Sequence, residues 1–297
     1  MIYTREKNVL NCNMPCTNCI DKRLIDVIKE SLDLNLSHFQ FGFKNAYEIS
    51  KFFSEDTRSY HFPALECVGN NPSIAILGIT KGITQVELSL KLLSETLNNT
   101  KDISSKELAS IINHTSIHAV FAGNQMRRHI SYLFDKIYLW KNLKINYNAS
   151  NPEKNVDEII GVPGGITHES FYFASFIKCA LLTNKGNSDA PSLKEISNLN
   201  GAKKCLERNL LPPFHLYKNM KLIITFGKTS FDIVNNLMVG DKLIIEHFNK
   251  LKIIPIFLPH PSGANTANLI KYVDNKLHLS WITTLNEARK IIENYLQ

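Results

Sequence analysis

The stretch Ile253–Asn268, read IIPIFLPHPSGANTAN, decides the fold predicted for this chain. It begins with a short apolar run, Ile253–Leu258, whose β-rich composition is typical of a buried strand in a parallel sheet. The run ends in a proline-rich turn that contains His260. Open α/β sheets bind their ligands outside the carboxyl ends of the strands. We therefore expect His260 at a ligand-binding edge, with an ordinary proline turn as the alternative.

Three further apolar segments have the length of buried strands. They are Ser73–Leu77, Ser170–Lys178 and Lys221–Phe226, and helical segments lie between them. Strands that alternate with helices predict a parallel sheet covered on both faces. The expected fold class is α/β: a three-layer α/β/α sandwich with a central, mainly parallel four-stranded sheet, in one domain over residues 1–297.

Local patterns predict some helices in more detail. The segment Asn45–Phe53 is expected to form a short helix, and Thr284–Leu296 a closing helix. Thr84 is expected to cap the helix after the first strand, because Glu87 stands at the capping-box position.

Composition indicates a soluble globular protein, with 44% hydrophobic and 21% charged residues. No apolar run approaches the roughly 18 residues of a membrane helix, and the first residues lack the apolar core of a signal peptide. We therefore expect a cytoplasmic location. The net charge of +7 is compatible with a polyanionic partner such as DNA, although many basic proteins bind no nucleic acid.

Cysteine spacing suggests a metal or redox site. Disulfides are rare in a reducing cytosol, so the Cys-x-x-Cys pair at Cys16 and Cys19 is typical of metal binding or redox chemistry. Ordinary thiols are the alternative at this stage.

The order of several motifs resembles the uracil-DNA glycosylase superfamily, and most of all its iron–sulfur branch. No single motif is decisive, and the resemblance rests on their order over about residues 16–270. The motifs are an early Cys-x-x-Cys, a Gly-x-x-x-Gly loop, Phe-x-Gly, Lys-Cys, a helical cysteine, a glycine after the third strand and His-Pro-Ser after the fourth. In this chain they are Cys16 and Cys19, Gly78–Gly82, Phe121–Gly123, Lys178-Cys179, Cys205, Gly227 and His260–Ser262.

This resemblance implies a monofunctional DNA glycosylase, which extrudes its target base into a pocket and breaks the N-glycosidic bond. The resemblance gives His260 the role of stabilising the negative charge that develops on the departing base. Thr80, in the middle of the glycine-bounded loop, is the second predicted catalytic residue.

Further site residues follow from the same resemblance. The residues expected to line the base pocket are Gly78, Ile79, Phe121 and Ser175. The residues expected to contact DNA are Ser262, Asn265 and Asn268. Phe121 would stack on the base, with a core phenylalanine as the alternative. Solvated helix-start residues are the alternative for the DNA-contacting group.

The resemblance also implies a metal centre of four cysteines, Cys16, Cys19, Cys179 and Cys205. A 4Fe–4S cluster is the favoured occupant and structural zinc the alternative, since both are held by cysteine thiolates. Its role would be structural. Cys12 and Cys67 are expected to be free thiols.

Two positions depart from the family pattern. Relatives commonly carry a carboxylate or amide in the first loop, where this chain has Thr80. Relatives that read uracil place an asparagine at the end of the second strand, where this chain has Ser175. Serine removes both a donor and an acceptor from the pocket, so we expect a pocket poorly suited to strict uracil recognition.

A larger base is therefore the expected substrate. The superfamily also includes a bacterial anti-phage glycosylase that removes glucosylated hydroxymethylcytosine from viral DNA, and the chain is similar to it. We expect a monomer that acts on phage or damaged DNA, with no membrane partner. A uracil-DNA glycosylase of base-excision repair, a catalytically degenerate DNA-binding member and an unrelated nucleotide-processing enzyme stay open as alternatives.

Overall fold

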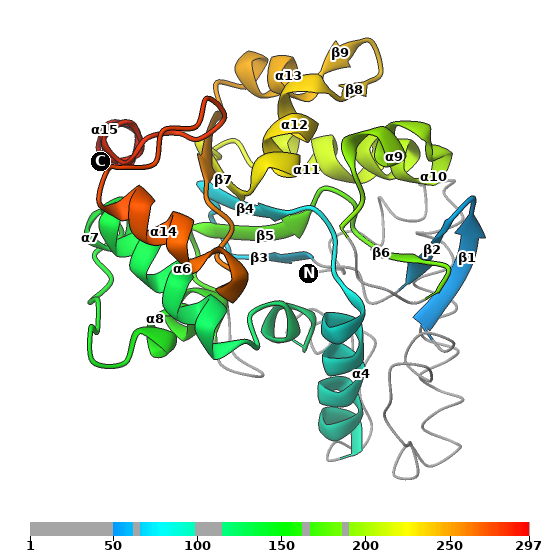
Figure 1. Ribbon diagram of the computed structural model, residues 1–297, viewed down its shortest axis with the longest axis horizontal. Helices are drawn as coiled ribbons and strands as arrows, with labels where there is room; N and C mark the ends of the chain where they lie inside the picture. Colours follow the sequence, from blue (N-terminus) through cyan, green and yellow to red (C-terminus); the bar gives the residue numbers. More distant parts are fainter. Residues whose placement is uncertain (1–49, 62–65, 99–114, 162–166, 186–189, 297) are drawn as a thin grey trace. The chain divides into compact units, whose positions relative to one another are not determined.

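The fold was analysed on a computed structural model, which describes residues 50–61, 66–98, 115–161, 167–185 and 190–296 (Figure 1). The chain divides into two compact units. The first contains Met1–Cys67, Ile79–Val120 and Ala174–Pro212, and the second contains Val68–Gly78, Phe121–Phe173 and Pro213–Gln297. The single domain expected over residues 1–297 stays a prediction. Within the described ranges, no helix combines the length and the apolar character needed to cross a membrane.

The main sheet has five strands in the order β10-β7-β4-β5-β3. Their bounds are Glu66–Val68 for β3, Ile74–Gly78 for β4, Phe171–Ser175 for β5, Leu222–Phe226 for β7 and Ile254–Leu258 for β10. Strands β4, β7 and β10 are parallel, and their register aligns Ile76, Ile224 and Ile256. The four strands expected from the sequence are thus confirmed.

Backbone hydrogen bonds give the direction of the other two strands. The N–H of Ile74 donates to Ser170 O and that of Ile177 donates to Ile79 O, so β5 also runs parallel to β4. The N–H of Gly69 donates to Phe171 O and that of Asn71 donates to Glu169 O, so β3 is antiparallel to β5. The sheet is therefore mainly parallel, as expected, and β3 adds a strand that the sequence did not reveal.

Burial explains why these strands were recognisable. Residues Ile74–Leu77 and all of Leu222–Phe226 are buried, as expected for strands covered on both faces. Thr225 is the polar exception, and its Oγ1 donates to Leu77 O at 2.9 Å. That bond satisfies the hydroxyl inside the core and connects β7 to β4.

Helices flank the sheet (Figure 1), which confirms the α/β/α arrangement. Helix α12 packs against β7, α13 packs against β10, and α6 packs against α8 and α14. The bounds in the second unit are Asn124–Lys136 for α6, Leu139–Asn142 for α7, Pro152–Ile160 for α8, Lys228–Asn236 for α12, Met238–Val239 for β8, Lys242–Leu243 for β9, Ile244–Lys250 for α13, Thr266–Val273 for α14 and Leu285–Tyr295 for α15.

The first unit contains an antiparallel sheet in the order β1-β2-β6. The strands of this sheet are Lys51–Glu55 for β1, Arg58–His61 for β2 and Ala180–Thr183 for β6. The helices of the first unit include Ile83–Asn98 for α4, Leu193–Asn198 for α9, Asn200–Cys205 for α10 and Leu206–Leu210 for the π-helical turn η3. Residues 115–120 are also helical, and α11, Leu211–Leu216, follows η3.

Two local predictions need correction. The helix expected over Asn45–Phe53 does not extend beyond Ser50, which is helical, because strand β1 begins at Lys51 and pairs with β2. Residues 45–49 lie outside the described part of the chain, and a helix there stays a prediction. Thr84 does not cap α4, because the helix already begins at Ile83. The N–H of Gly82 is satisfied instead by Gln85 Oε1 at 3.1 Å.

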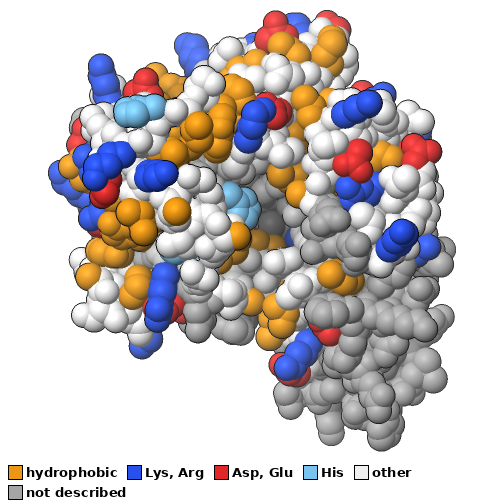
Figure 2. All heavy atoms as spheres, viewed as in Figure 1, with side chains coloured by type: hydrophobic (Ala, Val, Ile, Leu, Met, Phe, Trp, Pro, Cys, Tyr) orange, Lys and Arg blue, Asp and Glu red, His pale blue; other side chains and the backbone are white. Residues whose placement is uncertain are grey.

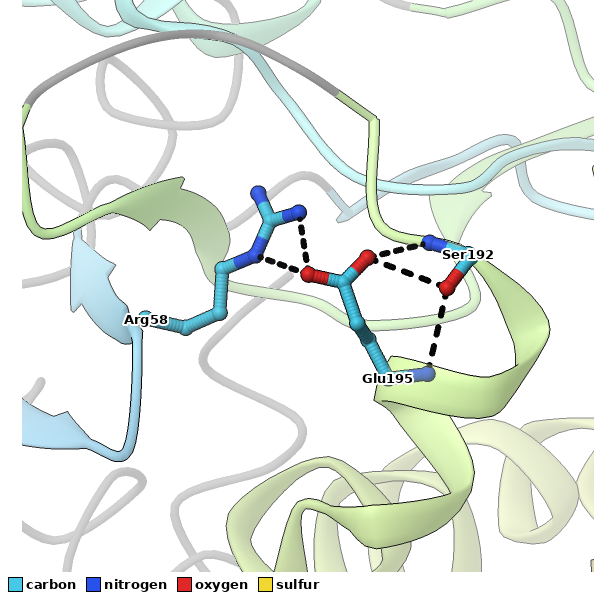
Figure 3. Close-up of polar contacts among 3 residues, drawn as sticks. All are labelled: Arg58, Ser192 and Glu195. Atoms are coloured by element: carbon cyan, nitrogen blue, oxygen red, sulfur yellow. Dashed lines mark hydrogen bonds and ion pairs between the residues drawn. The ribbon is translucent and has the colours of Figure 1, made fainter.

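One ion pair connects β2 to the start of α9 (Figure 3). Ser192 and Glu195 form a capping box, in which Ser192 Oγ accepts from Glu195 N and Glu195 Oε2 accepts from Ser192 N. The other carboxylate oxygen, Oε1, accepts from Arg58 Nη2 at 2.8 Å and from Nε at 3.2 Å. A single carboxylate thus caps the helix and neutralises an arginine whose side chain is only 4% exposed.

We predict that Glu195→Gln lowers the free energy of unfolding by about 1–2 kcal/mol, because it weakens charge-assisted hydrogen bonds to a buried guanidinium. The Glu195 side chain is 39% exposed, so solvent screening keeps the loss near the lower figure. Urea denaturation measures it, with Glu207→Gln at an exposed position of η3 as the control. Equal stability of the two variants would contradict the prediction.

Candidate functional site

His260 lies just beyond the carboxyl end of β10, as predicted. Leu258 and Phe226 end β10 and β7 in register, and the N–H of Gly227 donates to Leu258 O at 2.9 Å. A Cβ added to Gly227 would meet His260 Cβ at 3.6 Å, so the two residues are close neighbours. Gly227 has φ +83, a conformation that favours glycine. The ends of β7 and β10 therefore place Gly227 and His260 next to each other.

The His260 ring has a defined tautomer. Its Nδ1 accepts a hydrogen bond from the N–H of Ser262 at 3.2 Å. An accepting Nδ1 carries no hydrogen, so in the neutral ring the hydrogen is on Nε2. The side chain is exposed, yet enough protein surrounds it for desolvation to lower its pKa below the usual histidine value. His260 therefore offers a neutral Nε2–H donor near pH 7.

The predicted DNA-contacting residues hold the His260 loop. Asn265 Nδ2 donates to His260 O at 2.9 Å, and Asn268 Nδ2 donates to Asn265 Oδ1 at 2.8 Å. Ser262 precedes the 3-10 turn η4, Gly263–Asn265, which leads into α14. These contacts give the asparagines a structural role, and contact with DNA stays a prediction.

Phe121 packs in the core of the second unit. Its side chain is 5% exposed, and its ring meets that of Phe173 edge to face with centroids 5.7 Å apart. Its carbonyl accepts from Arg127 Nε, while Arg127 Nη1 pairs with Asp157 Oδ1 at 2.6 Å. This environment also suits the alternative of a core phenylalanine, and base stacking stays a prediction.

Thr80 has both hydrogen-bonding functions of its hydroxyl occupied by backbone. Its Oγ1 donates to Cys179 O at 2.8 Å and accepts from Leu181 N at 2.8 Å. The hydroxyl therefore joins the loop after β4 to the segment that enters β6. This geometry supports a positioning role, and a catalytic role for Thr80 stays a prediction.

The predicted pocket residues are assigned to both units: Gly78 and Phe121 to the second, Ile79 and Ser175 to the first. Of the predicted catalytic residues, His260 belongs to the second unit and Thr80 to the first. Gly78 ends β4. Ser175 ends β5 and is 1% exposed.

Lys81 is a buried lysine that the sequence analysis did not single out. Its side chain is 3% exposed, and Nζ donates to Ser116 Oγ at 2.7 Å. Desolvation lowers its pKa to about 7, and the nearby Cys179 opposes this shift only in part. The available signal was that Lys81 is the one charged residue within Gly78–Gly82.

Contacts of α6 with the His260 loop were also missed. His129 Nδ1 lies 3.0 Å from Pro261 O, and the side-chain amide of Gln125 lies against Gly263. Only the spacing of Gln125 and His129, one helical turn apart, hinted that they share a face.

Two of the four predicted metal ligands are described, and both are buried. The Sγ of Cys205 accepts from Lys178 N at 3.4 Å and from Asn209 Nδ2 at 3.7 Å. Since Lys178 precedes Cys179, the fold brings the two cysteines to one region. Cys12, Cys16 and Cys19 lie outside the described residues, as does the Cys67 side chain in β3. In the part of the chain that is described, no three potential ligand side chains form a metal-binding group.

Donors around the Cys205 sulfur fit a metal-bound thiolate. Hydrogen bonds to ligating sulfurs are a common feature of cysteine-ligated clusters, where they stabilise the charge on sulfur. The sulfur of Cys205 receives two N–H donors. Cys205, one of the two described cysteines of the predicted set, is therefore chemically suited to hold such a group.

Basic side chains are dispersed on the face seen in Figure 2. Lys and Arg side chains there are separated by uncharged and acidic ones, and they form no continuous strip on that face.

No model of a known protein family matches the chain, and comparison with curated proteins also gives no match. The functional argument rests on the residues and contacts described above.

We predict that Lys81→Met is more stable than the wild type at pH 6 and that this advantage shrinks toward pH 9. The pKa of Lys81 falls on folding from 10.5 to about 7. Between these values the unfolded chain binds more protons than the folded chain, so Lys81 makes stability rise with pH. Methionine removes this dependence.

Urea denaturation at pH 6, 7.5 and 9 tests the prediction. Lys203→Met, at an exposed position of α10, is the matched control. A stability difference that stays constant across this range would refute the account of Lys81.

Proposed function

We propose that this protein is a DNA glycosylase in which His260 stabilises the departing base. The observation that supports the proposal is a histidine at the carboxyl edge of a parallel sheet whose Nδ1 accepts from Ser262 N, so that the neutral ring carries its hydrogen on Nε2. A donor aimed at developing negative charge is a strong source of transition-state stabilisation. Neutrality suits this role, because the ring then accepts the Ser262 N–H on Nδ1 and carries its hydrogen on Nε2, where it can be donated to a base oxygen.

The proposed reaction is hydrolysis of one N-glycosidic bond. The bond between C1′ and the base breaks, and the base leaves with the electron pair. Water adds its oxygen to C1′ and supplies the proton that the base finally takes up. The products are a free base and an abasic site, and the phosphodiester chain stays intact. His260 contributes by accommodating charge on the base oxygen.

A modified pyrimidine larger than uracil is the proposed substrate. Ser175 offers a short hydroxyl where uracil-reading relatives have an asparagine, and the Thr80 hydroxyl is engaged by Cys179 and Leu181. Neither side chain supplies an amide to pair with a uracil edge. We propose a bulky phage base such as glucosylated hydroxymethylcytosine, removed in the cytoplasm during anti-phage defence. A uracil-DNA glycosylase of base-excision repair is the second candidate.

Base release by His260→Ala tests the proposed role of the histidine. We predict a loss on the order of 100-fold in abasic-site formation, which is the typical effect of removing one well-placed donor. The substrates are uracil duplexes and phage DNA that carries glucosylated cytosine, with alkaline cleavage as the readout. His278→Ala, at an exposed position after α14, is the control.

Two outcomes go against the proposal. Full activity of His260→Ala would show that the histidine is only a residue of the turn and has no catalytic role. DNA binding without abasic sites in the wild type would favour a catalytically degenerate DNA-binding protein.

We further propose that Cys16, Cys19, Cys179 and Cys205 hold a 4Fe–4S cluster, with zinc as the alternative. The two N–H donors at Cys205 Sγ support a thiolate at this position. When bound, the group would crosslink distant segments of the chain, and base release needs no chemistry from it.

Metal analysis tests this centre. We predict iron, with visible cluster absorbance, in the purified protein and loss of the metal in Cys205→Ala. Cys67→Ser, a cysteine outside the proposed ligand set, is predicted to retain the metal. Purified protein that contains neither iron nor zinc would contradict the proposal.

A further inference from the structure

Side chains of helix α6 contact the loop that carries His260. His129, in the second turn of α6, has Nδ1 at 3.0 Å from Pro261 O. A carbonyl oxygen only accepts hydrogen bonds, so the His129 Nδ1 must carry the hydrogen and donate it. The side chain of His129 is half-buried, and the two residues are separated by 132 positions in the sequence. This contact is therefore a tertiary one that local sequence does not dictate.

Pro261 O and the Ser262 N–H belong to the same peptide group. A peptide group is planar, so fixing its carbonyl also fixes the direction of its N–H. That N–H is the donor to His260 Nδ1 at 3.2 Å. One rigid plane thus receives a hydrogen bond from His129 at one end and gives a hydrogen bond to His260 at the other.

The two hydrogen bonds reinforce one another. A donor at the carbonyl oxygen polarises the amide and strengthens its N–H as a donor. The stronger this N–H, the more firmly His260 Nδ1 is kept as an acceptor, with its hydrogen on Nε2. The other side of the loop is also constrained, since Gln125 of α6 lies against Gly263 and Asn265 Nδ2 donates to His260 O.

We propose that His129 is a positioning residue that sets the tautomer and direction of His260 through the Pro261–Ser262 peptide. The inference deepens the proposed glycosylase function and rests on it for its effect on catalysis. His129 itself touches neither base nor water in this account. Its action is to keep the Nε2–H of His260 on the side that meets the substrate.

Three substitutions separate this role from simple packing. His129→Ala and His129→Phe remove the donor, and the second keeps an aromatic ring of similar size. His129→Asn keeps a donor, because its Nδ2–H lies close to the place of the imidazole Nδ1–H. Tyr132→Phe changes a polar group one turn further along α6 and is the matched control.

Nitrogen-15 NMR of histidine-labelled protein at pH 8 measures the His260 tautomer without any activity. We expect a hydrogen on Nε2 and none on Nδ1 in the wild type, in His129→Asn and in Tyr132→Phe. We expect the two nitrogen signals to move toward averaged values in both donor-free variants. Wild-type His260 signals in His129→Ala or His129→Phe would overturn the inference.

Kinetics of base release supply the second readout. Both donor-free variants are expected to lose at least about tenfold in kcat, since a misaligned donor no longer meets the developing charge. KM is expected to stay within about twofold, and His129→Asn to recover most of the lost kcat. Equal loss in His129→Asn and His129→Ala would indicate packing alone and overturn the inference.

The two readouts fail separately. A wild type that releases no base, combined with the expected NMR pattern, would refute the glycosylase proposal and leave the tautomer control intact. An active wild type with an unchanged His260 tautomer in His129→Ala would refute the tautomer control alone.

Discussion

The parallel pairing of β4, β7 and β10 is the constraint on which the proposed site depends. Parallel strands end at the same edge of a sheet, so Gly78, Phe226 and Leu258 finish in one row. Gly227, with its positive φ of +83, turns the chain directly beside His260. Register, rather than any single side chain, thus brings the histidine to the edge where such sheets bind ligands.

Polar groups near this edge are used to fix the backbone. Thr225 Oγ1 donates to Leu77 O inside the core, and Thr80 Oγ1 bridges Cys179 O and Leu181 N. Asn265 Nδ2 likewise donates to the backbone carbonyl of His260. Short hydroxyls and amides thereby hold the loops in defined positions. His260 is an exposed residue, and its ring uses only Nδ1 for a backbone hydrogen bond, from Ser262 N.

The sequence predicted the strands that are largely apolar and mostly buried. Strands β4, β7 and β10 are apolar along most of their length, which makes them recognisable without structural knowledge. The start of strand β1 was expected to be helical, because β1 depends on pairing with β2. Strand β2 pairs in turn with β6, where Arg58 meets Thr183 far along the chain. Helices α6 and α7 are separated at Tyr138, whose positive φ of 64 has no signal in the sequence.

The sequence predicted where the candidate site lies, but not the tertiary contacts that shape it. The position of His260 follows from a strand that ends in a proline turn, and this was confirmed. Its tautomer depends on the Ser262 N–H, and the direction of that N–H depends on His129 in another helix. Lys81 also escaped notice, because only burial distinguishes it from a solvated lysine. Such relations arise from tertiary contacts and leave no local pattern.

Mass spectrometry of the free bases released from a mixed panel of uracil-containing and phage-modified DNAs tests the central claim most directly. The account predicts that the protein liberates an intact modified pyrimidine, glucosylated hydroxymethylcytosine above all, and little uracil. Release of uracil alone, or of no base from any DNA in the panel, would contradict it.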